Sequence, residues 1–135
     1  MKEEIKDIAK EIDEWIENNP LSQALLERSN LKKGELKALM LYFRREDISF
    51  SDISPELGIN RSGAWKRWKK GYNKIIESFF TLELAVYGGI LDPEATQLLM
   101  EDLRDYLKLA HEKGNIEKIR SRLEKRLVEL EKRKK

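Results

Sequence analysis

The fold is decided by residues 49–73, which read SFSDISPELGINRSGAWKRWKKGYN. Ser49 and Asp52 have the spacing of a helix-capping box, so a short helix is expected to begin at Ser49. A start two residues later is also open, because it would relieve the hydrogen bond that Pro55 removes. Gly58 can adopt a positive φ and end this helix. The segment therefore predicts two helices joined by a tight turn.

The second helix of this segment has an apolar side and a basic side. On a wheel of 3.6 residues per turn, five apolar residues lie within about 80° of one another, which predicts one buried face. Residues 61–74 carry six basic side chains and no acidic one. The apolar residues are Ala64, Trp68, Tyr72, Ile75 and Phe79, and the opposite side carries Lys66, Lys69, Lys70 and Asn73, with Arg67 beside them.

Two short helices with a glycine-centred turn, the second of them basic, are typical of a helix-turn-helix. In that motif the first helix packs across the second, which presents its polar face to the major groove of DNA. Residues 33–76 resemble region 4 of the sigma-70 family and related regulators. In that family a leucine-rich helix, here residues 36–42, precedes a segment of the type S-x-x-E-I-A-x-x-L-G-I-S-x-S-T-V, here residues 49–64.

The match has three departures. Ser54 stands where the family usually has Ala, Pro55 lies within the first helix, and Gly63 and Ala64 replace the common Thr-Val pair. Nothing in the chain looks like the other sigma regions, so a complete sigma factor is excluded.

The resemblance implies that residues near the start of the second helix face bases and that neighbouring residues face phosphates. Arg can hydrogen-bond guanine O6 and N7 together, whereas Lys neutralises phosphate and releases counterions. The implied function is that of a sequence-specific, double-stranded-DNA-binding transcriptional regulator. The candidates for base edges are Arg61, Ser62, Trp65 and Lys66, and those for the backbone are Arg67, Lys69, Lys70 and Lys74.

Apolar residues at helical spacing predict further helices on both sides of this motif. Asp92 and Pro93 form a helix start, and Gly114 is expected to end that helix. Residues 81–87 also alternate as a strand would, but continued helix is favoured because no partner strand is visible. The expected helices cover about residues 2–18, 33–46, 92–114 and 116–131, and a short apolar segment around Leu21, Leu25 and Leu26 runs to Ser29 and Asn30.

We therefore expect an all-α protein in three parts. Residues 1–19 form an N-terminal amphipathic helix, residues 20–88 a helix-turn-helix DNA-binding core, and residues 89–135 a helical hairpin or oligomerisation segment. The apolar stripes of residues 2–18 and 116–131 require partners, and a homodimer that reads two DNA half-sites would supply them.

The composition argues against catalysis. Of the 135 residues, 39% are charged, the net charge is +2, none is Cys and His111 is the only His, so disulfides, thiol nucleophiles and the usual zinc sites are excluded. Glu101, Asp102 and Asp105 are spaced for one helical neighbourhood, but a solvated acidic face is expected there. Neither an enzyme activity, nor a metal, nor a cofactor is expected.

The sequence has no signal-peptide pattern and no run of 18 apolar residues, which predicts a soluble, cytoplasmic protein without a membrane partner. Abundant Glu and Lys with two Gln and no Cys are typical of thermophilic proteins.

Two other functions remain open from the sequence. The helix-turn-helix would be a scaffold in a protein-interaction adaptor that recruits RNA polymerase or a chromosome-organising complex. Alternatively, Trp65 would stack on bases in an RNA or single-strand binder. Trp68, on the apolar stripe, is expected in the core in either case.

Overall fold

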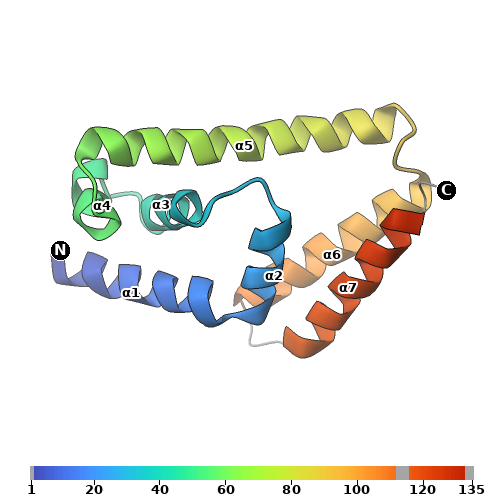
Figure 1. The fold of residues 1–135 in the computed structure, drawn as a ribbon, viewed down its shortest axis with the longest axis horizontal. Coiled ribbons are helices and arrows are strands. Elements are labelled where there is room, and N and C mark those ends of the chain that lie inside the picture. Colours follow the sequence, from blue (N-terminus) through green and yellow to red (C-terminus); the bar gives the residue numbers. More distant parts are fainter. Residues whose placement is uncertain (1, 112–115, 133–135) are drawn as a thin grey trace. The chain divides into compact units, whose positions relative to one another are not determined.

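The computed structural model describes residues 2–111 and 116–132, and within these residues it is all α-helical, with seven helices and no strand. Figure 1 shows their course along the chain. The helices are α1 (Lys2–Asn18), α2 (Pro20–Arg28), α3 (Lys33–Phe43), α4 (Phe50–Leu57), α5 (Arg61–Tyr87), α6 (Pro93–His111) and α7 (Ile116–Lys132). The all-α prediction is confirmed, and so is continued helix over residues 81–87. The end predicted at Gly114 lies outside the described residues.

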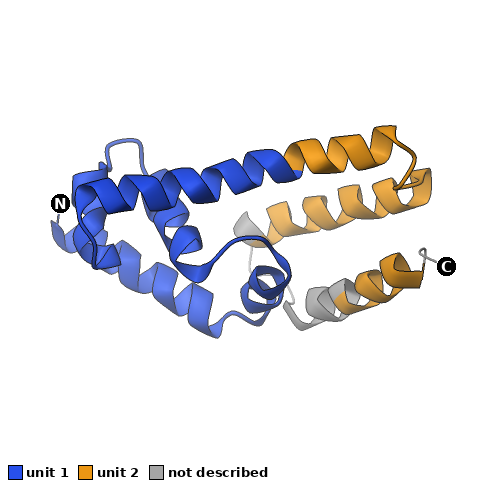
Figure 2. Cartoon of the chain, turned by 45° about the horizontal axis from the view of Figure 1, so that its top comes forward, with its two compact units in different colours: residues 1–78 blue, residues 79–135 orange. Residues whose placement is uncertain are grey.

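The chain divides into two compact units, Met1–Ser78 and Phe79–Lys135, which Figure 2 colours separately. The division falls within α5, ten residues before the boundary that the sequence predicts between residues 88 and 89. The compact units have no division between residues 19 and 20, because α1 belongs to the first unit and supplies part of its core.

The core of unit 1 is formed by α1, α3, α4 and the start of α5. Residues Ala9, Ile12 and Ile16 of α1 pack there with Leu41 and Ile53. The apolar stripe of α1 is thus covered within the same chain. This burial removes α1 as a reason to expect a dimer.

Ion pairs also join α1 to the helix that it covers. Asp13 pairs with Lys37 at 2.9 Å, Glu11 pairs with Arg44 at 2.7 Å, and Glu17 pairs with Lys33. Most of these side chains are half exposed, so each pair adds little stability. Together they match the acidic surface of α1 to the basic surface of α3.

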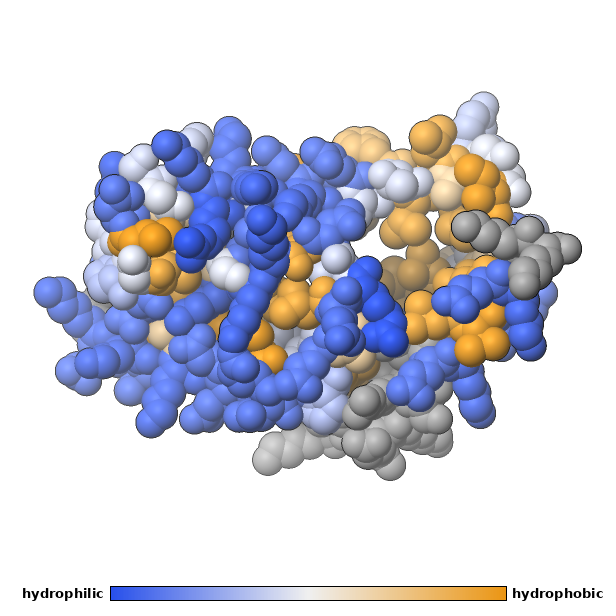
Figure 3. Space-filling model, in the orientation of Figure 1, coloured by the Kyte–Doolittle hydropathy of each residue, from blue (hydrophilic) through white to orange (hydrophobic). Residues whose placement is uncertain are grey.

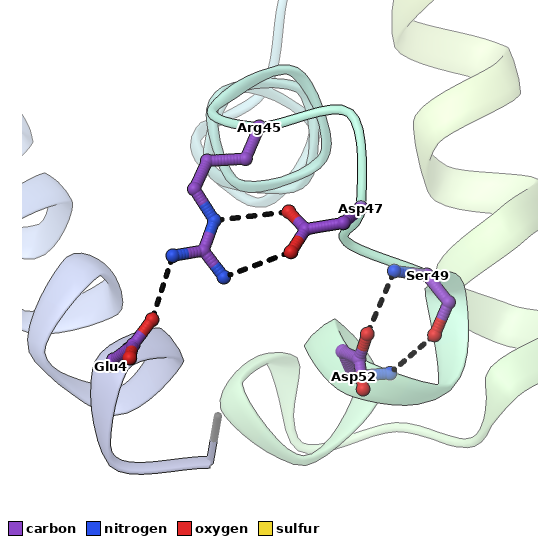
Figure 4. Close-up of polar contacts among 5 residues, drawn as sticks. All are labelled: Glu4, Arg45, Asp47, Ser49 and Asp52. Carbon is purple, nitrogen blue, oxygen red and sulfur yellow. Dashed lines mark hydrogen bonds and ion pairs between the residues drawn. The ribbon is translucent and has the colours of Figure 1, made fainter.

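Helix α3 ends at Phe43, three residues before the predicted end. The chain turns over residues 45–48, where the Ile48 N–H donates to the Arg45 carbonyl, and this turn carries Ile48 into the core. The Arg45 guanidinium lies between Asp47 (Nε to Oδ1, 3.0 Å) and Glu4 of α1 (Nη1 to Oε2, 2.7 Å), as Figure 4 shows. With α3 ending at Phe43, the turn thus carries both the Arg45 contacts and the buried Ile48.

Helix α4 begins with the capping box that the sequence predicts, and Ser49 is its N-cap. The Asp52 N–H donates to Ser49 Oγ at 3.2 Å, and the Ser49 N–H donates to Asp52 Oδ2 at 2.9 Å (Figure 4). The hydrogen bonds from the Ser49 backbone and side chain hold the pKa of Asp52 below its ordinary value. The earlier of the two possible starts is therefore the correct one.

Ser54 and Pro55, two of the residues that differ from the sigma-70 region 4 pattern, compensate for each other in α4. Pro55 has no N–H to donate to the carbonyl of Ser51, one turn earlier. The Ser54 hydroxyl donates to that carbonyl at 3.2 Å. Ser54 thus satisfies the backbone acceptor that Pro55 leaves, which lets α4 continue through the proline.

Candidate nucleic-acid interface

The turn between α4 and α5 sets the direction of the basic helix. Gly58 has φ 68° and ψ 26°, the left-handed conformation, and its N–H donates to the Pro55 carbonyl at 3.2 Å. Asn60 then caps α5, because its side-chain oxygen accepts the Gly63 N–H at 2.7 Å. These contacts end one helix and start the next within three residues.

One face of α5 packs closely on α3. Ala64 is completely buried, and Gly71 is buried at the point where the two helices approach each other. A Cβ added at Gly71 would lie 3.0 Å from Leu39 Cδ1 and 3.2 Å from Glu35 Cβ. The absence of a side chain at Gly71 is therefore what allows this approach.

The buried face predicted for α5 extends less far than expected. Trp68 and Ile75 are partly buried, but Tyr72 is 37% exposed and Phe79 is 67% exposed. Unit 1 ends at Ser78, so Phe79 belongs to the second unit. The apolar stripe is thus a core face only in the first half of the helix.

The aromatic residues of the motif differ in their environment. Trp68 contacts the rings of Tyr42, Phe50 and Tyr72 with centroid distances of 5.1 to 5.5 Å, as expected for a core residue. Its indole N–H is buried and has no hydrogen-bond partner among the described residues. Trp65 is 42% exposed, and Lys69 Nζ lies 5.0 Å from its ring centroid, so its indole is accessible from solvent.

The outward face of α5 collects most of the predicted site residues. By helical position, Ser62, Lys66, Lys69 and Asn73 lie within about 60° of one another, opposite Ala64. All four are exposed. Two further cations are exposed, Lys70 at the edge of this face and Arg61 at the first position of α5. We call these six residues the outer basic face.

A groove runs beside the outer basic face, between α5 and the start of α3. Its volume is about 480 Å³. Arg67, which is partly buried, lies against Gly34, where an added Cβ would be 3.2 Å from the guanidinium. The groove is lined by Lys32, Gly34, Glu35, Gly63, Lys66, Arg67 and Lys70. Four cations thus face one carboxylate in this groove.

The carboxylate of Glu35 forms an ion pair with Lys74, the last of the predicted DNA-binding cations. Lys74 Nζ lies 2.7 Å from Glu35 Oε1, and the two side chains are 22% and 5% exposed. Burial alone would raise the pKa of Glu35, but hydrogen bonds from Lys74 and the Lys32 N–H, with the charges of Lys74 and Lys70, outweigh it and lower the pKa. Lys74 is therefore paired with Glu35 in the protein, which favours a structural role for Lys74 over the predicted phosphate contact.

Two residues of this surface are absent from the sequence-based site. Asn73 lies on the polar side of the helical wheel and was identifiable by its spacing from Lys66 and Lys69. Lys32 comes from a different helix boundary and reaches the groove only through the packing of α3 on α5. No local signal in the sequence points to Lys32.

Other kinds of site are not found in the part of the chain that the structure describes. Residues 2–111 and 116–132 contain no group of three or more His, Cys, Asp or Glu side chains arranged to hold a metal ion. Within the same residues, no helix combines the length and the apolar character needed to span a bilayer. Comparison of the chain with protein-family models, curated proteins and solved structures finds no match.

Proposed function

We propose that the protein is a transcriptional regulator that binds double-stranded DNA in a sequence-specific manner through the first half of α5. One observation carries this proposal: the outer basic face is exposed along three turns, and the first acidic residue of α5 is Glu77. An exposed helix face with this charge, following a tight turn, suits the major groove and its phosphates.

The chemistry of each side chain on this face suits it either to base edges or to phosphates. Arg61, Ser62 and Lys66, in the first turns of α5, are suited to base edges, since Arg and Lys hydrogen-bond guanine and Ser bonds to several bases. Lys69 and Lys70 are suited to phosphates. The groove cations Lys32 and Arg67 extend the phosphate surface toward α3.

The test is the binding of labelled duplex DNA by fluorescence anisotropy from about 50 to about 300 mM salt. About four or five phosphate contacts give a log–log slope near −4, at about 0.9 per phosphate. The double reversal Lys66→Glu with Lys69→Glu removes one base contact and one phosphate contact and adds two negative charges. We expect it to weaken binding by about 100-fold or more and to reduce the slope by about 1.

The matched control is Lys6→Glu with Lys10→Glu, two exposed residues of α1 that change the net charge by the same amount. If the control weakens binding as much as the α5 variant, the contact is not on α5 and the proposal is wrong. Absence of duplex binding at low salt also overturns it. Tighter binding of single strands, with quenching of tryptophan fluorescence, would assign the surface around Trp65 to single-strand recognition instead.

A further inference from the structure

The second unit has a large uncovered apolar surface. Among its described side chains, Ala95 is the only hydrophobic residue that is buried. By contrast, seven large hydrophobic side chains are 52% to 93% exposed: Phe79, Phe80, Leu84, Tyr87, Ile90, Leu103 and Leu107. Figure 3 shows hydrophobic surface, in orange, over the last turns of α5 and the turn that follows them.

The exposed apolar area of these side chains, taken together, is large for a chain of this size. At about 200 Å² for an aromatic side chain, the exposed parts of Phe79, Phe80 and Tyr87 alone present about 450 Å². The largest apolar patch on a monomer is about 300–600 Å². With the four aliphatic residues the total approaches about 800 Å² per chain, which is what one partner buries in a standard interface.

Five of the seven exposed residues, together with Met100, lie in two stripes at helical spacing, whereas Phe79 lies on another side of α5 and Ile90 lies after its end. On α5, Phe80, Leu84 and Tyr87 follow at steps of four and three residues. On α6, Met100, Leu103 and Leu107 follow at steps of three and four, and all three are exposed. This spacing is that of helices that pack against other helices.

A hollow lies beside the stripes. It has a volume of about 480 Å³ and lies at the turn from α5 to α6, with Val86, Leu91, Pro93 and Met100 among its lining residues. The lining is mainly apolar, so an apolar side chain from a partner would fit there better than water.

The charges beside the two stripes are complementary. Glu83 borders the α5 stripe, whereas Arg104 and Lys108 border the α6 stripe, and all three are exposed. If the α5 stripe of one chain lies on the α6 stripe of a second copy, two-fold symmetry makes the same contact twice. Each contact then brings Glu83 of one chain to the cations of the other.

From the area, the two stripes and the charges together, we infer that unit 2 is the dimerisation surface, and that a second copy of this chain covers it as a four-helix arrangement of two α5–α6 hairpins. This differs from a dimer through α1, whose apolar stripe is buried in its own unit. The inference does not rest on DNA binding, since it concerns only residues of the second unit.

The experiment is sedimentation equilibrium of the full chain without DNA, from about 1 to about 100 µM. We expect a mass of twice 16.0 kDa at the upper end. Leu84→Glu with Leu107→Glu places a charge in each stripe and should raise the dimer dissociation constant by about 100-fold or more. The control is Phe43→Glu, at an exposed hydrophobic residue of unit 1, which should leave the dimer unchanged. Far-UV circular dichroism checks that each variant keeps its helical content.

A charge exchange tests the pairing without altering the apolar surface. Glu83→Arg and Arg104→Glu should each weaken the dimer, and the two together should restore it. A wild-type chain that stays monomeric at about 100 µM overturns the inference. So does a dimer that the Leu84/Leu107 variant leaves intact, because the copies would then meet elsewhere. Either result leaves the DNA-binding test unaffected.

Discussion

Glu35 joins α3 to the basic helix α5, and its substitution should lower the free energy of unfolding of unit 1. Its side chain accepts the Lys32 N–H at 2.9 Å, which caps α3, and pairs with Lys74 of α5 at 2.7 Å. Loss of a capping acceptor costs about 1 kcal/mol. Loss of one partner from a fully buried ion pair costs about 3–5 kcal/mol, and the partial exposure of Lys74 reduces this to about 2.

We therefore expect Glu35→Ala to lower the free energy of unfolding by about 3 kcal/mol. Glu35→Gln keeps an acceptor for the Lys32 N–H and loses only the charge, so its cost should be about 2 kcal/mol. Urea unfolding followed by tryptophan fluorescence measures this directly, because Trp15, Trp65 and Trp68 all lie in unit 1.

The dependence on pH has a defined sign. The pKa of Glu35 is lower in the folded protein than its ordinary value, so its contribution is fully present above about pH 5 and is lost as the pH falls through the folded pKa. The stability difference between the wild type and Glu35→Gln should therefore shrink in acid. A double-mutant cycle with Lys74→Met should give a coupling of about 1–2 kcal/mol. A coupling near zero, or a difference that does not change with pH, would refute this reasoning.

Three further substitutions test the packing around α5. Gly58→Ala places a Cβ at φ 68° and should cost about 1 kcal/mol, measured as a lower urea midpoint, with Gly58→Asn costing less. Gly71→Ala should lower the free energy of unfolding by about 1–2 kcal/mol, because its Cβ would lie 3.0 Å from Leu39 Cδ1, although Ala favours helices. A variant more stable than the wild type would show that α3 and α5 can move apart at no cost. Trp68→Phe removes a buried N–H without a partner among the described residues and should change stability by less than about 1 kcal/mol, whereas Trp68→Ala should cost about 3–5 kcal/mol in thermal unfolding.

Local signals predicted most of the helix boundaries. The capping box at Ser49, the positive φ at Gly58 and the start at Asp92 depend on residues within one turn of one another, and all three are confirmed. The polar side of α5 was also predictable, since the period of 3.6 residues alone separates Lys66 and Lys69 from Ala64. Short-range chemistry is sufficient for these features.

The tertiary structure decided which helices cover one another and which charges remain available. The stripe of α1 predicted only that some apolar partner exists, and packing shows that the partner is the core of unit 1. In the sequence Lys74 cannot be distinguished from the basic residues beside it, whereas in the structure it pairs with Glu35 of α3. The packing of α3 against α5 also places Lys32 in the lining of the groove. The sequence by itself determined an all-α chain with one basic helix face, because helix period and helix caps depend on neighbouring residues. Only the tertiary structure separated structural cations from solvent-facing cations, because this distinction depends on contacts between residues far apart in the chain.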